Sequence, residues 1–139
     1  YFKNISDEMF SSGKKSYHMS KSDQYGYITD NITVSSKTTS IEISLSSNVF
    51  VTDPGEGFPL IIFEVNDEEK KNVIYDQRDF NNANNSTVEK GRWNSVKYFS
   101  YFELPPDIKT DKVKIKLYIW NNKASDFFMD DLNVKITIK

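Results

Sequence analysis

The stretch Tyr118–Lys139, YIWNNKASDFFMDDLNVKITIK, decides the fold because it holds the end of one strand pattern, a short polar loop and the whole of a second pattern. In the second pattern, apolar residues occupy every other position, at Leu132, Val134, Ile136 and Ile138. Successive side chains of a strand point to opposite faces of a sheet. The pattern therefore predicts a strand with one face on a hydrophobic core and the other face in water.

The residues just before this stretch alternate in the same way. In residues 111–122, DKVKIKLYIWNN, the apolar positions are Val113, Ile115, Leu117 and Ile119, and lysines stand between them. Residues 40–46 (SIEISLS), 59–65 (PLIIFEV) and 92–106 (RWNSVKYFSYFELPP) also have the composition of strands, with turn residues between them. No stretch keeps a helical period, so the chain is predicted to be all-β, with antiparallel strands that have one wet face.

Composition narrows the class of protein. The chain has 139 residues and a formal net charge of −2, from 18 basic and 20 acidic residues without a basic block. We therefore expect one domain over residues 1–139, with neither nucleic acid nor a membrane as its partner. There is no cysteine, which excludes thiolate chemistry and disulfides. Because the chain begins at Tyr1 without a methionine, we expect a fragment of a longer exported or membrane-anchored protein.

Two acids open the last predicted strand. If the alternation is extended backward from Leu132, Asp131 points outward and Asp130 points toward the core, provided that no bulge intervenes. A buried carboxylate needs a partner, which could be backbone N–H groups, a Lys or Arg side chain, or a metal ion. Calcium is the metal that best suits carboxylate and carbonyl oxygens.

Three segments resemble galactose-binding-like jelly rolls, a family that includes many carbohydrate-binding modules. The C-terminal LYIWNNKASDFFMDDLNVKI is similar to their last strand pair, FSSGKKSYHMS to their opening strand, and GRWNSVKYFSYFELPP to a middle strand that ends at Leu-Pro. The segments occur in the family's order and together span most of the chain. The resemblance implies a two-sheet antiparallel jelly-roll sandwich that acts as a non-catalytic binding module.

The same resemblance implies a structural calcium ion at the sheet edge. In the family, the first acid of the Asp-Asp pair is a ligand, which corresponds to Asp130. A backbone carbonyl near residues 13–15 and an acid of the first strand complete the set, and here Asp7 and Glu8 are the acids that could take that place.

Aromatic side chains are the candidate ligand-binding residues. Tyr118 and Trp120 share the outward parity of the neighbouring lysines, and Trp93 opens its predicted strand beside a polar loop. Exposed rings stack on the C–H faces of sugars, while neighbouring polar groups bond the hydroxyls. Polar residues available for this role are Asn121, Asn122, Arg78 and Asp79. The alternative is that Trp93 and Trp120 pack into the core near the strand ends.

No sequence feature indicates catalysis. The single histidine, His18, lies in a predicted strand, and the nucleophile elbow, the zinc-binding His-Glu-x-x-His pair and the glycine-rich phosphate loop are all absent. Asp130 and Asp131 are adjacent in a strand, so they are not expected to flank one glycosidic bond. We therefore expect a domain that is not an enzyme.

These observations lead to three functional hypotheses. The first is an extracytoplasmic module (secreted, periplasmic or on the cell surface) that binds a polysaccharide or glycan on a concave sheet face. The second is a structural or protein-interaction domain of an exported bacterial protein with no sugar site. The third is an accessory domain of a larger glycan-processing enzyme. We expect the domain to be a monomer or part of a larger chain.

Overall fold

A computed structural model describes residues 5–6, 16–34, 37–67, 72–81, 87–105 and 113–139. These ranges contain nine strands and no helix, so they also contain no helix that could cross a membrane. The strands are β1 (Ile5–Ser6), β2 (Ser16–Met19), β3 (Tyr25–Thr33), β4 (Ser40–Asp53), β5 (Leu60–Asn66), β6 (Asn72–Asp79), β7 (Trp93–Glu103), β8 (Lys114–Trp120) and β9 (Asp126–Ile138).

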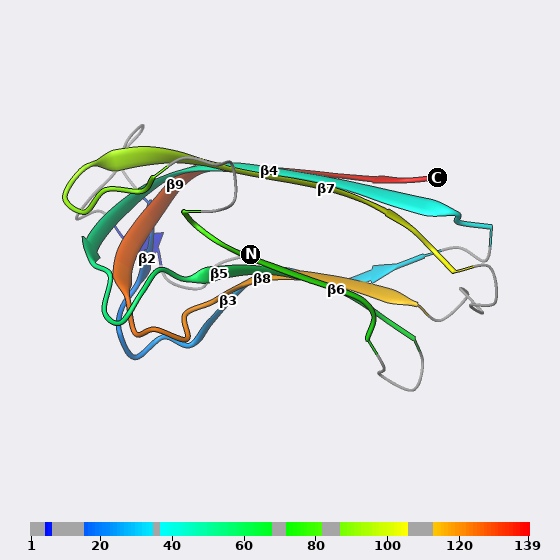
Figure 1. Cartoon of the computed structure of the whole chain (residues 1–139), viewed down its shortest axis with the longest axis horizontal. Helices are drawn as coiled ribbons and strands as arrows, with labels where there is room; N and C mark the ends of the chain where they lie inside the picture. Colours follow the sequence, from blue (N-terminus) through cyan, green and yellow to red (C-terminus); the bar gives the residue numbers. More distant parts are fainter. Residues whose placement is uncertain (1–4, 7–15, 35–36, 68–71, 82–86, 106–112) are drawn as a thin grey trace.

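The strands form two antiparallel sheets that pack face to face (Figure 1). The five-stranded sheet has the order β1-β2-β9-β4-β7, and the four-stranded sheet has the order β3-β8-β5-β6. The pairs β5·β6, β4·β7, β3·β8 and β2·β9 are nested in the sequence, and the connections before and after β5·β6 cross from one sheet to the other. This is the connectivity of a jelly roll, so the predicted fold is confirmed.

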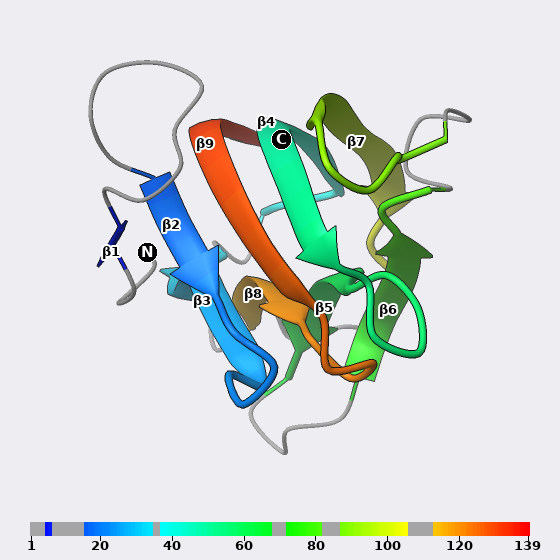
Figure 2. The ribbon, with the colours of Figure 1, turned by 90° about the vertical axis from the view of Figure 1, so that its left-hand side faces the viewer.

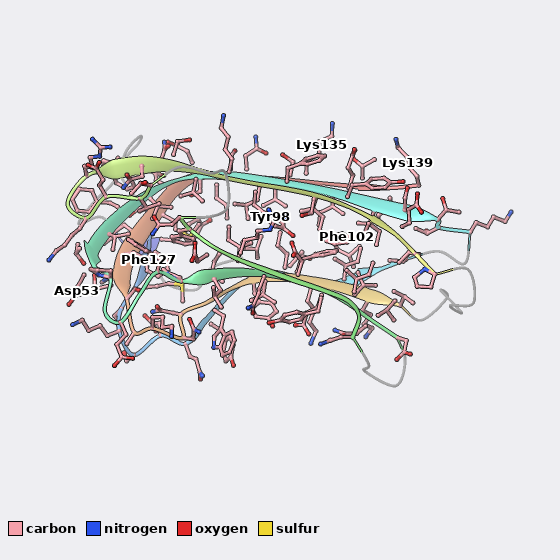
Figure 3. All side chains as sticks on the ribbon, viewed as in Figure 1. Asp53, Tyr98, Phe102, Phe127, Lys135 and Lys139 are labelled. Atoms are coloured by element: carbon pink, nitrogen blue, oxygen red, sulfur yellow. The ribbon has the colours of Figure 1, made fainter. Side chains whose placement is uncertain are left out.

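The hydrophobic core lies between the sheets. Along β4, the side chains of Ile41, Ile43, Leu45, Val49 and Val51 are almost completely buried, and more exposed residues stand between them. The inward residues predicted for β8 are buried as well: Val113, Ile115, Leu117 and Ile119 are 0% exposed. Figure 3 shows Tyr98, Phe102 and Phe127 between the two layers, whereas Lys135 and Lys139 extend away from the five-stranded sheet.

The last strand contains a β-bulge that the alternating sequence pattern did not predict. The register of β9 against β4 shifts between Asp130 and Asn133, and Asp131 has a φ of 53°. Met129 belongs to the core before the bulge, and Leu132 packs against the core after it. Asp130 therefore follows an inward residue and faces away from the core, because the extra residue of a bulge reverses the parity. The prediction that Asp130 points toward the core is wrong.

Candidate functional site

An aromatic surface covers the outer side of the four-stranded sheet. Ile119 points into the core, so Tyr118 and Trp120 on either side of it face outward. The register places Tyr25 of β3 directly opposite Trp120. On the far edge, Tyr75 of β6 is opposite Glu64, which also faces outward. We call Tyr25, Tyr75, Tyr118 and Trp120 the aromatic face.

Three rings of the aromatic face lie close together. The rings of Tyr25 and Trp120 are nearly parallel, at 14°, with centroids 6.4 Å apart. Tyr25 meets Tyr118 edge to face, with centroids 6.0 Å apart. Two rings remain accessible: Tyr25 is 45% exposed and Tyr75 is 44% exposed. The face therefore offers ring surface to a ligand from both edge strands of the sheet.

Beneath these rings lies Ile62, an apolar residue that does not belong to the core. It stands between the core residues Ile61 and Phe63, so it faces outward, yet it is 0% exposed. Its register neighbours are Tyr118 and Gln77. Side chains on the outer side of the sheet thus form a second packed layer, which fixes the rings in position before any ligand arrives.

Polar groups border the aromatic face. The Tyr75 hydroxyl donates to Gln77 Oε1 at 3.2 Å. Burial raises the pKa of Tyr75, and the nearby Glu64 and Tyr25 raise it further. The hydroxyl therefore stays protonated at neutral pH and remains a donor.

One buried donor on this face has no acceptor. The indole Nε1 of Trp120 is buried and has no hydrogen-bond partner in the part of the chain that the structure describes. A buried N–H group without a partner is costly, and such groups in proteins are usually satisfied by water or a ligand. This donor has no accessible surface, so a ligand stacked on the Tyr25 ring does not reach it in this conformation.

Asn121, a predicted ligand-binding residue, instead organises the loops at one end of the sandwich. It is 4% exposed, and its Nδ2 lies within 3.1 Å of the carbonyl oxygens of Ser20, Asp23 and Ser125. Its Oδ1 accepts the backbone N–H of Ser125 at 2.9 Å. Backbone groups thus use the whole amide of Asn121, which anchors these loops to one another.

Two other predicted residues lie away from the aromatic face. Trp93 belongs to the five-stranded sheet, where its ring meets Phe50 edge to face with centroids 5.6 Å apart. Arg78 shares the inward parity of Asp76, and its Nε lies 3.8 Å from Asp76 Oδ2 at the open edge between the sheets. Of the five predicted ligand-binding residues, the structure therefore brings together only Tyr118 and Trp120.

Sequence reasoning missed Tyr25 and Tyr75. Both stand in strands whose alternation is weak, and each strand is an edge strand of the four-stranded sheet. The presence of aromatic residues in these two segments was the sequence feature that could have indicated them as candidate binding residues. Only the pairing of β3 with β8 and of β6 with β5 shows that they share a face with Trp120.

The predicted metal ligands are only partly described. Asp130 is 8% exposed, its Oδ1 accepts the backbone N–H of Asp131 at 2.8 Å, and its carbonyl accepts the Ser47 hydroxyl. Asp7, Glu8 and residues 13–15 lie outside the described residues. Within the described ranges no group of three or more His, Asp or Glu side chains could hold a metal ion. Calcium at Asp130 remains a prediction, and it can be tested by measuring Tm with and without a chelator.

The histidine is part of a structural pair. His18 stacks on Phe128 with centroids 4.2 Å apart, and its Nε2 lies 3.1 Å from Asp126 Oδ1. The Thr52 hydroxyl also lies 2.7 Å from that carboxylate oxygen. The histidine is thus held by a ring and a carboxylate, and the neighbouring hydroxyl donates to the carboxylate as well.

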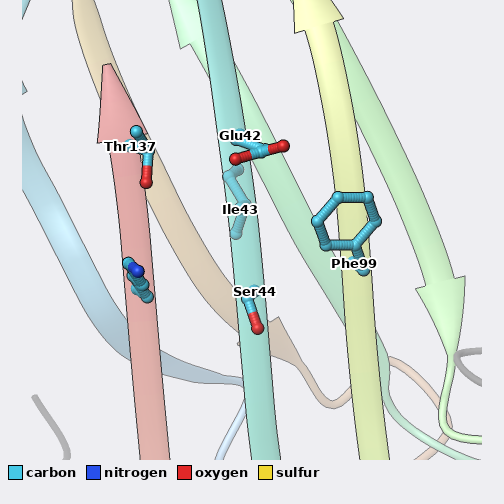
Figure 4. Close-up of a pocket in the computed structure, with 6 residues that line it drawn as sticks. Glu42, Ile43, Ser44, Phe99 and Thr137 are labelled. Atoms are coloured by element: carbon cyan, nitrogen blue, oxygen red, sulfur yellow. The ribbon is translucent and has the colours of Figure 1, made fainter. Parts of the chain in front are cut away.

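The five-stranded sheet carries a different feature on its outer side. A shallow depression of about 260 Å³ crosses β9, β4 and β7 (Figure 4). Its lining residues are Glu42, Ile43, Ser44, Phe99, Lys135 and Thr137. Phe99 is its one aromatic ring, and the other side chains on this surface are short or charged. The depression therefore lacks the neighbouring rings of the aromatic face.

Comparisons with known proteins concern the fold. The chain matches no protein-family model and no curated protein. It is similar to the solved CBM22-1–GH10 modules of endo-1,4-β-D-xylanase 10B from Clostridium thermocellum, complexed with xylohexaose: identity is 20% and the TM-score 0.49, over 98% of this chain and 24% of that chain. A CBM4 structure is similar with 13% identity and a TM-score of 0.37, over 96% and 68% of the two chains. The chain thus spans about a quarter of the xylanase structure.

Proposed function

We propose that this domain is a non-catalytic, extracytoplasmic binding module and that its aromatic face binds a polysaccharide or glycan chain. The observation that carries the proposal is the meeting of Tyr25, Tyr118 and Trp120 on one outer surface, at centroid distances of 6.0 and 6.4 Å. The resemblance of three sequence segments to carbohydrate-binding modules supports the same class.

The chemistry of the aromatic face suits a sugar. The C–H groups of a pyranose ring present an apolar surface that packs on an aromatic ring, and its hydroxyls need hydrogen-bond partners. Tyr25 and Tyr75 supply the accessible ring surface. Gln77 and Glu64 stand beside Tyr75 and supply polar groups for the sugar hydroxyls.

The arrangement along the sheet favours a chain over a single sugar. Tyr25 and Tyr75 lie on the two edge strands of the four-stranded sheet, three strand spacings apart. Adjacent strands are about 4.8 Å apart, so the strands that carry these residues are separated by roughly 14 Å. We therefore expect a ligand that runs across the sheet from one edge strand to the other to be a chain of sugars.

Binding to a panel of soluble polysaccharides, measured by affinity electrophoresis and then by calorimetry, tests the proposal. We expect at least one polysaccharide to bind, and we expect Trp120→Ala to weaken that binding about tenfold or more. Trp93→Ala is the matched control, because it removes the other tryptophan from the opposite sheet. A panel without binding would favour a structural or protein-interaction domain, and equal loss in the two variants would contradict the assignment of binding to the aromatic face.

A further inference from the structure

Strand β7 forms one margin of the five-stranded sheet. It pairs with β4 on one side, and within the described residues no strand pairs with its other side. Figures 1 and 2 show β7 beside β6 at the same margin of the sandwich. An edge strand of 11 residues presents a row of backbone groups that can pair with another strand.

The outward residues of this edge strand are unusually apolar. Phe99 is 60% exposed and Tyr101 is 53% exposed, more than any other large hydrophobic residue that the structure describes. Lys97 and Glu103 flank them on the same face and are also exposed. Burial of both rings would therefore remove a sizeable apolar surface from water.

The register of β7 against β4 determines which of its residues direct their backbone N–H and C=O groups toward the free edge. Leu104 N–H donates to Thr39 O at 2.8 Å, and the register between β4 and β7 runs without a shift. In an antiparallel pair, alternate residues of a strand turn their N–H and C=O groups toward the partner. The even-numbered residues of β7 therefore bond to β4, and the odd-numbered residues turn these groups toward the free edge.

The sequence of β7 is close to a palindrome about Ser100. Residues 96–104 read VKYFSYFEL, in which Val96 mirrors Leu104 and Lys97 mirrors Glu103. In the same way the aromatic residues on the two sides match one another: Tyr98 with Phe102, and Phe99 with Tyr101. A strand with this symmetry is complementary to an antiparallel copy of itself.

We propose that two copies of this chain associate through their β7 strands, antiparallel, with a two-fold axis at Ser100. Lys97 then lies opposite Glu103 of the second copy, and Phe99 lies opposite Tyr101 of the second copy. Both pairings join odd-numbered residues, whose backbone groups are directed at the free edge. An interface of this isologous kind buries the same surface on both subunits and closes as a dimer.

Charge selects this register over its neighbours. With the axis at Phe99, Lys97 would face Tyr101 of the second copy and Glu103 would face Ser95. With the axis at Tyr101, Glu103 would face Phe99 of the second copy. Only the axis at Ser100 pairs both charges with opposite charges, and cross-strand pairs of opposite charge and of aromatic rings stabilise a sheet.

Sedimentation velocity of the protein over a range of concentrations tests the proposal. We expect a dimer at high concentration that dissociates on dilution. Lys97→Glu places like charges opposite one another at both ends of the pairing, and we expect it to raise the dissociation constant about tenfold or more. The double variant Lys97→Glu with Glu103→Lys restores the complementarity, and we expect it to restore the dimer.

Lys114→Glu is the matched control, because it makes the same charge change at an exposed position of the other sheet. Hydrogen exchange supplies a second measurement: the amides of Phe99 and Tyr101 should be protected in the dimer and exposed in Lys97→Glu. A wild-type protein that is monomeric at every concentration overturns the proposal. So does a dimer that survives Lys97→Glu, or a folded double variant that stays monomeric. Glycan binding by the aromatic face of the other sheet is an independent matter.

Discussion

The outer faces of both sheets carry exposed aromatic residues, but these residues are arranged differently on the two faces. On the four-stranded sheet, aromatic side chains from β3, β8 and β6 share one surface above the buried Ile62. On the five-stranded sheet, the exposed rings Phe99 and Tyr101 both belong to the edge strand β7. That sheet also brings rings together across its strands, but these rings are buried or only partly exposed: Trp93, Phe50, Phe128 and His18. The two faces therefore differ in where their most exposed rings lie: on both edge strands of the four-stranded sheet, and along one edge strand of the five-stranded sheet.

Removal of the layer beneath the aromatic face should have the largest effect on stability. Ile62→Ala removes a fully buried side chain, and we expect the free energy of unfolding to fall by about 2–4 kcal/mol. Ser44→Ala, at an exposed position on the outer face of the other sheet, should change it by less than about 0.5 kcal/mol. Urea denaturation of both variants measures the difference. Equal, small effects would show that no packed layer exists above the four-stranded sheet.

Loss of the loop anchor beside Trp120 should have the next largest effect. Asn121→Ala removes the acceptor of the Ser125 backbone N–H and a donor to the carbonyl groups of Ser20, Asp23 and Ser125. Unsatisfied buried groups cost about 1–3 kcal/mol each, so we expect the free energy of unfolding to fall by about 2 kcal/mol. Asn122→Ala, at the exposed neighbouring position, is the control. If Asn122→Ala destabilises the protein as well, the stabilisation comes from the loop as a whole and not from the amide of Asn121.

Tyr98 connects the two sheets and should make stability depend on pH. Its hydroxyl donates to Asp76 Oδ2 at 2.7 Å, and burial is the main cause that raises the pKa of Tyr98 in the folded state. An unfolded tyrosine ionises near pH ~10. Below that pH the tyrosine is protonated in both states and its stabilising contribution is complete. Above it only the unfolded state ionises, so stability falls as the pH rises.

We therefore expect the Tm of the wild-type protein to fall more steeply between about pH 9.5 and 11 than that of Tyr98→Phe. Thermal denaturation across this range measures both slopes. Parallel slopes would show that the Tyr98 hydroxyl is not protected from ionisation by the fold.

The smallest effect should come from one hydroxyl at the margin of the aromatic face. Tyr75→Phe keeps the ring but removes the donor to Gln77. We expect the affinity for a bound polysaccharide to fall about two- to fivefold, and stability to remain within about 0.5 kcal/mol of wild type. Tyr101→Phe, an exposed tyrosine on the other sheet, is the control for calorimetry. An unchanged affinity in Tyr75→Phe would confine the binding surface to β3 and β8.

Much of the fold could be predicted because it depends on local alternation. The apolar positions of β8 and the outward positions of Tyr118 and Trp120 follow from a period of two, and the structure agrees with both. The bulge in β9 could not be found in this way. Before the bulge Phe127, Phe128 and Met129 are all apolar, so no alternation fixes the phase there, and the shift of register depends on how Ser47 and its neighbours in β4 meet Asp130.

The candidate site was less predictable because it depends on contacts between distant segments. Tyr25 and Trp120 are neighbours only through the pairing of β3 with β8. Asn121 follows an outward tryptophan and precedes a polar loop, so its sequence context indicates exposure. Its burial results from the meeting of the loops that hold Ser20 and Ser125, which no local pattern specifies.

Because β7 is an edge strand, the proposed dimer would affect the avidity of the protein for a polymeric ligand. A two-fold axis that relates two antiparallel edge strands runs perpendicular to their sheet, so it leaves both four-stranded sheets on the same side of the pair. Two aromatic faces would then look in one direction, and a polymer held by the first would meet the second at a high effective concentration. Weak contacts on each subunit would add up along a fibre or cell wall while a short, free oligosaccharide gained nothing.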